Sequence, residues 1–352
     1  TDVYGLNEKS GTIYFQAAKE SPLQREVYSV KVNGGSFNRL SPNAGTNTAA
    51  FSNGFKYFIN YHSTALTPYY ISVNDNKGSE IRMMKDNQTL KDLLSQYANT
   101  SLDFIKIPGA DGTPLNASMI KPKEYDPNKK YPVLMFVYGG PGSQTVKDSW
   151  GSSNYLWYQM LADKGYIIVS VDNRGTGARG EKFKKMTYLQ LGKYETEDQI
   201  AAAKWLGDQA YIDKSRIGIW GWSYGGYMSS LCLFKGADVF KMAMAVAPVT
   251  NWKFYDSIYT ERYMQTPKEN PGYEENSPIN HVSKLEGKYL LVHGTADDNV
   301  HFQNSVEMVS ALQRANKQFD LMMYPDRNHG IYGGTIRLHL YNMLTNYVTE
   351  NL

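Results

Sequence analysis

The chain of 352 residues is 41% hydrophobic and 20% charged, with a formal net charge of +3 at pH 7. These values are typical of a soluble globular protein with a sizeable core. The small net charge, without a cluster of Lys and Arg, argues against a nucleic-acid partner. No apolar run approaches the roughly 18 residues that a membrane span needs, and the first residues do not resemble a signal peptide. Cys232 is the only cysteine, so an internal disulfide is excluded, which fits a reducing compartment or a bacterial envelope.

The first part of the chain contains two similar segments, residues 11–42 and 54–86, which are offset by about 43 positions. Each reads as an alternating strand, a loop with proline, a second strand, a turn and a third short strand. A period near 40 residues with about four strands per unit is typical of propeller blades. Because propellers usually have roughly four to eight blades, we expect this chain to be the C-terminal part of a longer protein. A small β-sandwich that stands alone is the alternative.

Beyond residue 97 the pattern changes to long apolar runs that alternate with helical stretches. Helices are expected over 195–210, 227–234 and 304–316. Apolar strands that alternate with helices indicate an α/β fold with a mostly parallel sheet covered on both faces. Ligand chemistry in such sheets collects at the carboxyl ends of the strands. The predicted strands lie within YPVLMFVYGGPG (131–142), GYIIVSVDNRG (165–175), SRIGIWGWS (215–223), FKMAMAVAPV (240–249), GKYLLVHGTADD (287–298) and FDLMMYPDRNHG (319–330).

The stretch GWSYG at residues 221–225 directly follows one of these strands and directly precedes a helical stretch. In this setting the pattern G-x-S-x-G is typical of a nucleophile elbow, a tight turn that exposes a serine hydroxyl above the sheet of an α/β-hydrolase. It predicts Ser223 as the nucleophile, and a glycine-rich packing turn with an incidental serine is the alternative. We therefore expect two domains, propeller blades over 1–97 and an α/β-hydrolase domain over 98–352.

A serine hydroxyl needs an adjacent base, which is usually histidine. In this fold the base follows the serine and the acid in chain order, so His329, after the last predicted strand, is the expected base. His293 ends a strand but does not come last. The orienting carboxylate should lie on a loop between the serine and the base, where Asp297 and Asp298 are equal candidates and Asp326 is less favoured. The full set of histidines is His62, His281, His293, His301, His329 and His339.

Acyl transfer also needs hydrogen-bond donors aimed at the developing oxyanion. The backbone N–H of Tyr224, immediately after the serine, is one expected donor. The second donor is expected from the loop VYGGPG, where Tyr138 is placed to offer its phenolic hydroxyl. Packing at the end of the strand is the alternative role for Tyr138.

The chain contains the motifs VYGGPGS, GWSYGGYMSS, VAPVTNWKFYDSIYTERYM, HGTADDNVHFQ and DRNHGI. They closely resemble the catalytic domain of the dipeptidyl peptidase IV branch of the prolyl oligopeptidase family of serine peptidases. The resemblance runs from about residue 101 to the C-terminus, and the N-terminal blades look like the end of that family's propeller. It implies Ser223 as nucleophile, Asp297 as orienting carboxylate and His329 as base. It also implies that the Tyr138 hydroxyl and the Tyr224 N–H form the oxyanion hole.

The resemblance further implies an apolar, aromatic pocket that holds proline or alanine beside the scissile bond. In the family, paired glutamates and an arginine bind the free amino terminus of the substrate. They lie in propeller segments outside this sequence, so none of its residues is assigned those roles. The residues that match the pocket are Val249, Trp252, Tyr255, Tyr259 and Val300, with Tyr224 as a wall and Asn299 near the carbonyl of the preceding substrate residue.

The expected function is that of a serine exopeptidase that releases N-terminal dipeptides with proline or alanine at the penultimate position through an acyl-enzyme. An acylpeptide hydrolase, a tripeptidyl peptidase, an esterase and a non-catalytic binding relative are the alternatives. The resemblance implies a peptide substrate, no metal, no organic cofactor, and a location in the periplasm or cell envelope. The C-terminal stretch over 333–352 is expected to form a helix that serves either as a homodimer interface or as a simple packing helix.

Overall fold

The structure is a computed structural model that describes residues 2–97, 100–151 and 154–352. Its contacts divide the chain into two compact units. The predicted domain boundary at residue 98 falls on residues 98–99, which lie outside the described residues. Unit 1 comprises Thr1–Leu102 and Val146–Gln159, and unit 2 comprises Asp103–Thr145 and Met160–Leu352.

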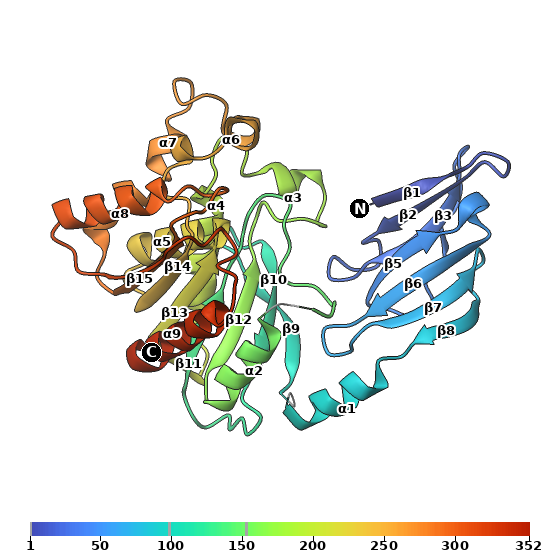
Figure 1. Cartoon of the computed structure of the whole chain (residues 1–352), viewed down its shortest axis with the longest axis horizontal. Helices are drawn as coiled ribbons and strands as arrows, with labels where there is room; N and C mark the ends of the chain where they lie inside the picture. Colours follow the sequence, from blue (N-terminus) through green and yellow to red (C-terminus); the bar gives the residue numbers. More distant parts are fainter. Residues whose placement is uncertain (1, 98–99, 152–153) are drawn as a thin grey trace. The chain divides into compact units, whose positions relative to one another are not determined.

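Unit 1 contains two antiparallel sheets of four strands each, in which every strand pairs with its neighbour along the chain. This is the arrangement of propeller blades, and it confirms the two predicted repeats. The first strand of each sheet precedes the similar segments seen in the sequence. The sheets comprise β1 (Asp2–Asn7), β2 (Thr12–Ala17), β3 (Glu26–Lys31) and β4 (Asn38–Arg39), and then β5 (Thr46–Phe51), β6 (Tyr57–Ser63), β7 (Tyr70–Asp75) and β8 (Glu80–Lys85) (Figure 1).

Aromatic side chains form a small core between the two sheets of unit 1. Along β2, buried and half-buried residues alternate, because successive side chains of a strand point to opposite faces. The rings of Tyr14 and Phe55 stack with centroids 4.9 Å apart, and those of Phe51 and Phe58 lie 5.0 Å apart. The helix α1 (Gln88–Tyr97), absent from the predicted elements, follows the second sheet.

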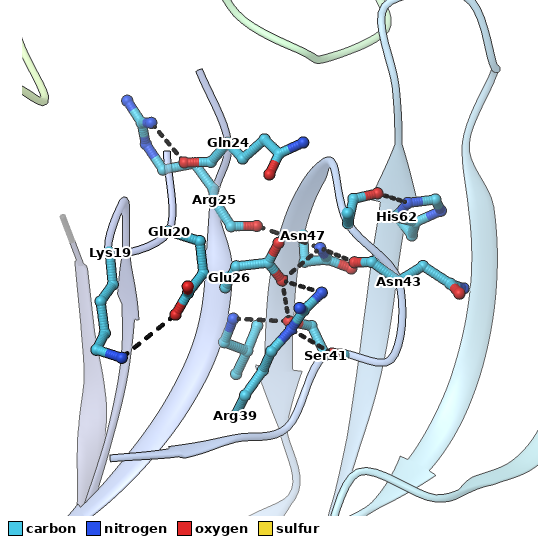
Figure 2. A network of polar contacts seen from close by, with 12 residues as sticks. Lys19, Glu20, Gln24, Arg25, Glu26, Arg39, Ser41, Asn43, Asn47 and His62 are labelled. Atoms are coloured by element: carbon cyan, nitrogen blue, oxygen red, sulfur yellow. Dashed lines mark hydrogen bonds and ion pairs between the residues drawn. The ribbon is translucent and has the colours of Figure 1, made fainter. Parts of the chain in front are cut away.

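A buried polar network also links the two sheets (Figure 2). Glu26, at the start of β3, is 1% exposed, and its Oε2 accepts hydrogen bonds from Ser41 Oγ at 2.5 Å and Asn47 Nδ2 at 3.2 Å. Arg39 forms an ion pair with the same oxygen at 3.0 Å. Loss of water around the carboxyl raises the pKa of Glu26 above its usual value in spite of these donors.

The segment Val146–Gln159 belongs to unit 1 although it follows a strand of unit 2 in the sequence. Asp148 anchors it. Its carboxylate accepts hydrogen bonds from the Ala65 N–H at 2.9 Å and from Gln24 Nε2 at 3.2 Å, and its carbonyl accepts one from Thr46 Oγ1 at 2.8 Å. One aspartate therefore ties this segment to both blades.

Unit 2 is built on an eight-stranded sheet with the order β16-β15-β14-β13-β11-β12-β10-β9. Neighbouring strands from β16 to β12 are parallel, whereas β10 pairs antiparallel with β12. The mostly parallel sheet confirms the predicted α/β fold, and each predicted apolar run overlaps one of the parallel strands, although β13 begins three residues before its predicted run. The strands are β9 (Leu102–Pro108), β10 (Pro114–Ile120), β11 (Tyr131–Phe136), β12 (Ile167–Asp172), β13 (Ile212–Trp222), β14 (Met242–Val246), β15 (Lys288–Gly294) and β16 (Asp320–Tyr324).

Helices cover both faces of this sheet, with α9 in front of it and α4 and α5 behind it in Figure 1. The central strands are apolar where both faces are covered, and all five residues of β14 are buried. Within the described residues, no helix is both long and apolar enough to cross a membrane. The helices are α2 (Tyr155–Asp163), α3 (Glu181–Lys185), α4 (Lys193–Gly207), α5 (Tyr224–Lys235), α6 (Ser257–Met264), α7 (Gly272–Glu275), α8 (Gln303–Arg314) and α9 (Ile336–Asn351), with 3-10 turns at Trp252–Phe254, Pro278–Asn280 and Val282–Lys284.

Candidate active site

Ser223 lies in the sharp turn between β13 and α5, with a φ of 60° and a ψ of −119°. Residues other than glycine rarely adopt this backbone conformation, so the turn is strained. A Cβ atom on Gly221 would lie 2.4 Å from the Val137 carbonyl oxygen, and one on Gly225 would lie 2.1 Å from the same atom. Both glycines are therefore required because the end of β11 passes directly beside the turn. This is the local geometry of a nucleophile elbow.

Asp297 and His329 come together at the carboxyl ends of β15 and β16. His329 Nδ1 lies 2.7 Å from Asp297 Oδ2, and the imidazole is 23% exposed while the carboxylate is buried. Asp297 Oδ1 accepts hydrogen bonds from the backbone N–H groups of Asn299 at 3.0 Å and Val300 at 2.9 Å. Burial alone would raise the pKa of the Asp297 carboxyl, but hydrogen bonds from His293 and His329 hold it well below its usual range.

The other two candidate carboxylates are placed differently. Asp298 and Asp326 are both exposed. The described contacts of His329 include a hydrogen bond to Asp297 and none to either of these aspartates. Chain order does not distinguish Asp297 from Asp298. The geometry favours Asp297 as the partner of the imidazole.

Trp222 connects the elbow to the loop that carries His329. Its indole Nε1–H donates to the His329 carbonyl oxygen at 3.0 Å. Arg337, on α9, donates to the Gly330 carbonyl at 2.9 Å and stacks over the Trp222 ring at 5.0 Å. In the described part of the chain Ser223 Oγ has no hydrogen-bond partner, which is common before substrate binds. The histidine loop is thus held by the residue next to the serine.

Tyr138 and Tyr224 supply the candidate oxyanion donors. Tyr138 follows β11, is 37% exposed, and has its ring centroid 6.0 Å from that of Tyr224. Loss of water raises the pKa of the Tyr138 phenol, so the hydroxyl stays protonated and remains a donor at neutral pH. Tyr224 is the first residue of α5, and the N–H groups of a first helical turn have no partner within the helix. Among the described residues its N–H has no hydrogen-bond partner, so it can donate to a negative oxygen.

The aromatic residues predicted to form a pocket pack together. The Trp252 ring stacks on Tyr259 at 5.8 Å and lies 5.4 Å from Tyr224, while Tyr255 meets Tyr259 edge to face at 5.4 Å. The Tyr255 hydroxyl donates to Asn299 Oδ1 at 2.7 Å. Val249 and Val300 are buried in the same hydrophobic core as Tyr224 and Trp252. The predicted pocket and triad residues all lie in unit 2.

Two buried residues of the site were not predicted. His293 Nε2 lies 3.2 Å from Asp297 Oδ2. Glu195, on α4, accepts hydrogen bonds at Oε1 from the Tyr224 hydroxyl at 2.7 Å and from the Gly192 N–H at 3.0 Å. Desolvation raises the pKa of Glu195 to about 7. An acidic residue three positions after a glycine at the start of a helix signals only a helix cap, so the contact with Tyr224 leaves no trace in the sequence.

Within the described residues, no three His, Cys, Asp or Glu side chains converge on a point where they would hold a metal ion. Unit 2 instead carries a serine in a strained turn, a histidine hydrogen-bonded to a buried carboxylate, and two candidate oxyanion donors. This set is suited to nucleophilic acyl transfer.

The chain is similar to known proteins over both of its parts. Residues 153–352 match the family model described as "Prolyl oligopeptidase family", and residues 1–69 match the model described as "Dipeptidyl peptidase IV (DPP IV) N-terminal region". The whole chain aligns with half of a crystal structure of Porphyromonas gingivalis dipeptidyl peptidase 4, with 47% identity, a TM-score of 0.96 and coverage of 50% of that chain.

Two further relatives are more distant. A crystal structure of a putative dipeptidyl aminopeptidase IV from Bacteroides ovatus is 32% identical, with a TM-score of 0.89, over all of this chain and 50% of that one. A probable dipeptidyl-aminopeptidase B from Trichophyton verrucosum is 43% identical over 336 residues, which cover 93% of this chain and 37% of the relative. The chain therefore spans half or less of the length of the relatives that it matches.

Proposed function

The chain belongs to the prolyl oligopeptidase family, and we propose that it carries the catalytic part of a serine exopeptidase that releases N-terminal dipeptides with proline or alanine at the penultimate position. The observation that carries this proposal is the short hydrogen bond, 2.7 Å, between His329 Nδ1 and the buried Asp297 Oδ2. The His329 carbonyl also accepts a hydrogen bond from Trp222, the residue next to the elbow serine. The names of the relatives, dipeptidyl peptidase and dipeptidyl aminopeptidase, support the substrate class.

In the acylation step, Ser223 Oγ attacks the carbonyl carbon of the scissile bond while His329 Nε2 takes the hydroxyl proton. Asp297 stabilises the imidazolium that forms and fixes the tautomer with Nδ1 protonated. The Tyr138 hydroxyl and the Tyr224 N–H donate to the oxyanion of the tetrahedral intermediate. Collapse of the intermediate breaks the C–N bond, the imidazolium returns its proton to the leaving amine, and the dipeptide stays bound to the serine as an ester.

In the deacylation step, water attacks the ester carbonyl and His329 takes a proton from that water. A second oxyanion forms against the same two donors. The Ser223 oxygen leaves with the proton from the imidazolium, and the dipeptide is released as a free acid. The same groups thus act twice, once on the amide and once on the ester.

Specificity for proline or alanine rests on the aromatic cluster of Tyr224, Trp252, Tyr255 and Tyr259. Flat rings on several sides favour a compact apolar side chain and exclude water from it. Asn299 accepts a hydrogen bond from Tyr255 at Oδ1, which leaves its amide N–H₂ as the proposed donor to the carbonyl of the preceding substrate residue. The group that binds the free amino terminus remains unassigned within this chain.

The proposal includes a peptide substrate, a location in the periplasm or cell envelope, and a homodimer formed through α9. The helix buries Leu340, Leu344 and Val348 against its own unit, while Leu338 is 63% exposed. Sedimentation of the wild-type protein and of a Leu338→Glu variant tests the dimer, which should dissociate in the variant. Fractionation of cells with an antibody against the chain tests the location.

Cleavage of a Gly-Pro anilide, compared with its N-acetylated form, tests the activity. We expect release of the chromophore by the wild-type protein and none by Ser223→Ala. Preference for the free amine supports a dipeptidyl peptidase. Cleavage of the acetylated form alone would instead identify an acylpeptide hydrolase, and cleavage of neither, with normal folding, would overturn the proposed function.

A further inference from the structure

His293 is a fully buried histidine that contacts the carboxylate of the proposed triad. It lies next to the end of β15 and is 0% exposed. Its Nδ1 lies 2.6 Å from Ser305 Oγ on α8. Its Nε2 lies 2.8 Å from the Val300 carbonyl oxygen and 3.2 Å from Asp297 Oδ2. Every polar atom of this side chain therefore has a partner.

These contacts fix the tautomer of the ring. A carbonyl oxygen only accepts hydrogen bonds, so the Nε2 atom that faces Val300 must carry a proton. The Nδ1 atom then accepts from the Ser305 hydroxyl. A neutral imidazole satisfies all three contacts, which matters because a charged group without access to water is costly. A single N–H is thus shared between the Val300 carbonyl and the Asp297 carboxylate.

The arrangement leaves Asp297 with donors on both oxygens. Oδ1 accepts hydrogen bonds from the backbone N–H groups of Asn299 and Val300. Oδ2 accepts hydrogen bonds from the rings of His329 and His293. Rotation of the carboxylate would break hydrogen bonds at both oxygens. The lone pair of Oδ2 that faces His329 is consequently held in one direction.

We propose that His293 is a positioning residue for the reaction, which acts through Asp297 and not on the substrate. Its Nε2–H orients the carboxylate toward His329 and ties it to the backbone of Val300, a residue of the proposed pocket. The inference rests on the proposed function, because it takes His329 to be the base. Neither the order of residues nor the elbow motif assigns this histidine a role.

Removal of the His293 donor should change the pKa of His329 in one direction. Loss of the His293 donor leaves more negative charge on Asp297 Oδ2, which stabilises protonated His329 and raises the pKa of that imidazole. Two further titratable or charged side chains contact the neighbouring loops among the described residues: Arg337 on α9 donates to the Gly330 carbonyl, and Tyr255 donates to Asn299. Substitution of His293 leaves both in place.

Two substitutions separate positioning from simple packing. Glutamine at position 293 extends an amide N–H about as far as imidazole Nε2, whereas the amide of asparagine is one carbon shorter and reaches only the Nδ1 position. We expect His293→Asn to lower kcat by about 10²-fold with little change in KM, because small misplacements of catalytic groups cost this much. The acid limb of the kcat/KM profile should move to higher pH. His293→Gln should restore both values toward those of the wild type.

A measurement without substrate keeps the result independent of the proposed activity. The His329 Nδ1 proton, which is hydrogen-bonded to Asp297, should give a downfield resonance in proton NMR that His329→Ala removes. We expect its pH midpoint to rise in His293→Asn and to return in His293→Gln. If the protein cleaves no Gly-Pro anilide, the proposed function fails while this titration still decides the role of His293.

Equal midpoints in the wild type and in His293→Asn, or a loss of kcat that is the same in both variants with no pH shift, would overturn the proposal. Should His293→Asn fail to fold by thermal melting, Ser305→Ala takes its place, since it removes only the partner of Nδ1. Its midpoint should move in the same direction by a smaller amount. An unchanged midpoint in a folded Ser305→Ala protein would then count against His293.

Discussion

Glu26 in the blades and Asp297 in the hydrolase unit are both buried carboxylates, yet their pKa values move in opposite directions. All hydrogen bonds to Glu26 reach Oε2, and Oε1 is buried without a partner among the described residues (Figure 2). Asp297 receives donors on both oxygens. Glu195 resembles Glu26, because its Oε1 takes two donors while its Oε2 has none among those described, and desolvation raises its pKa to about 7.

At Asp297 the hydrogen bonds from two imidazoles, the charge interaction with His329 and the backbone donors together outweigh the loss of water, which they do not at Glu26 or Glu195. Glu26 and Glu195 lose water without full replacement, so the neutral form gains. Asp297 exchanges water for two backbone N–H groups and two imidazoles, so the charged form gains. A carboxylate that must stabilise an imidazolium during turnover needs the second environment.

The largest effect is expected from removal of the negative charge at Asp297. Asp297→Asn should lower kcat by about 10⁴-fold, because the amide favours the wrong tautomer of His329 and does not stabilise the imidazolium. The adjacent Asp298→Asn is the matched control and should cleave the Gly-Pro anilide at close to the wild-type rate. An equal loss in both variants would show that the two aspartates are not distinguished as the contacts indicate.

The next effect concerns the oxyanion. Tyr138→Phe should lower kcat by about 10²–10³-fold, since one donor to the developing charge is lost. Tyr188→Phe, at a tyrosine that is 49% exposed in the same unit, controls for loss of a phenol in general. Steady-state kinetics of both variants decide the matter. Unchanged turnover in a folded Tyr138→Phe protein would remove this residue from the oxyanion hole.

Glu195 should make the stability of the protein depend on pH. Its folded-state pKa of about 7 lies above the ordinary value of 4.5, so the folded state keeps a proton that the unfolded chain releases in this window. Stability should therefore fall as pH rises from about 4.5 to 7, by roughly 3 kcal/mol in all. Urea unfolding of the wild type and of Glu195→Gln across this range measures the effect. The free energy of unfolding of Glu195→Gln should rise relative to that of the wild type as pH rises. A difference that stays constant with pH would show that Glu195 does not titrate in this range.

Glu26 should act in the same direction with a smaller effect, because Ser41 and Arg39 partly offset its loss of water. Its folded-state pKa is raised, so its contribution to stability is greatest below its ordinary pKa and declines as pH rises above it. Thermal melting of Glu26→Gln against the wild type should show a relative gain for the variant at higher pH. A relative gain at lower pH would mean that the ion pair with Arg39 dominates this network.

Much of the fold could be predicted because the pattern of apolar residues in each segment matches the strand that the segment forms. The alternation in the two N-terminal segments and the apolar runs beyond residue 97 correspond to the blades and to the parallel strands of the sheet. The segment Val146–Gln159 could not be assigned in this way. Its membership of unit 1 depends on hydrogen bonds from Asp148 to residues about 80 to 120 positions away, which leave no local signal.

The helix α6 shows a signal that was available. Asp256 accepts a hydrogen bond from the Tyr259 N–H at 2.8 Å and caps the helix, and an aspartate before such a stretch is a common start.

The sequence predicts those residues of the candidate site that chain order identifies, and it does not decide between residues that chain order leaves equivalent. The elbow motif and the position of His329 after the last strand are both statements of order. The choice between Asp297 and Asp298 depends on which carboxylate the loop turns inward to meet the Asn299 and Val300 N–H groups. The backbone conformation of the loop decides which carboxylate points inward, and two adjacent aspartates give no sequence signal of that conformation.

Mass spectrometry of the acyl-enzyme tests the central claim most directly. The chain is mixed with a Gly-Pro anilide, quenched in acid during the first turnovers and digested. We predict a Gly-Pro ester on the peptide that contains Ser223, present in the wild type, enriched when deacylation is slowed, and absent from Ser223→Ala. Release of the chromophore without such an adduct, or an adduct on another residue, would contradict the account.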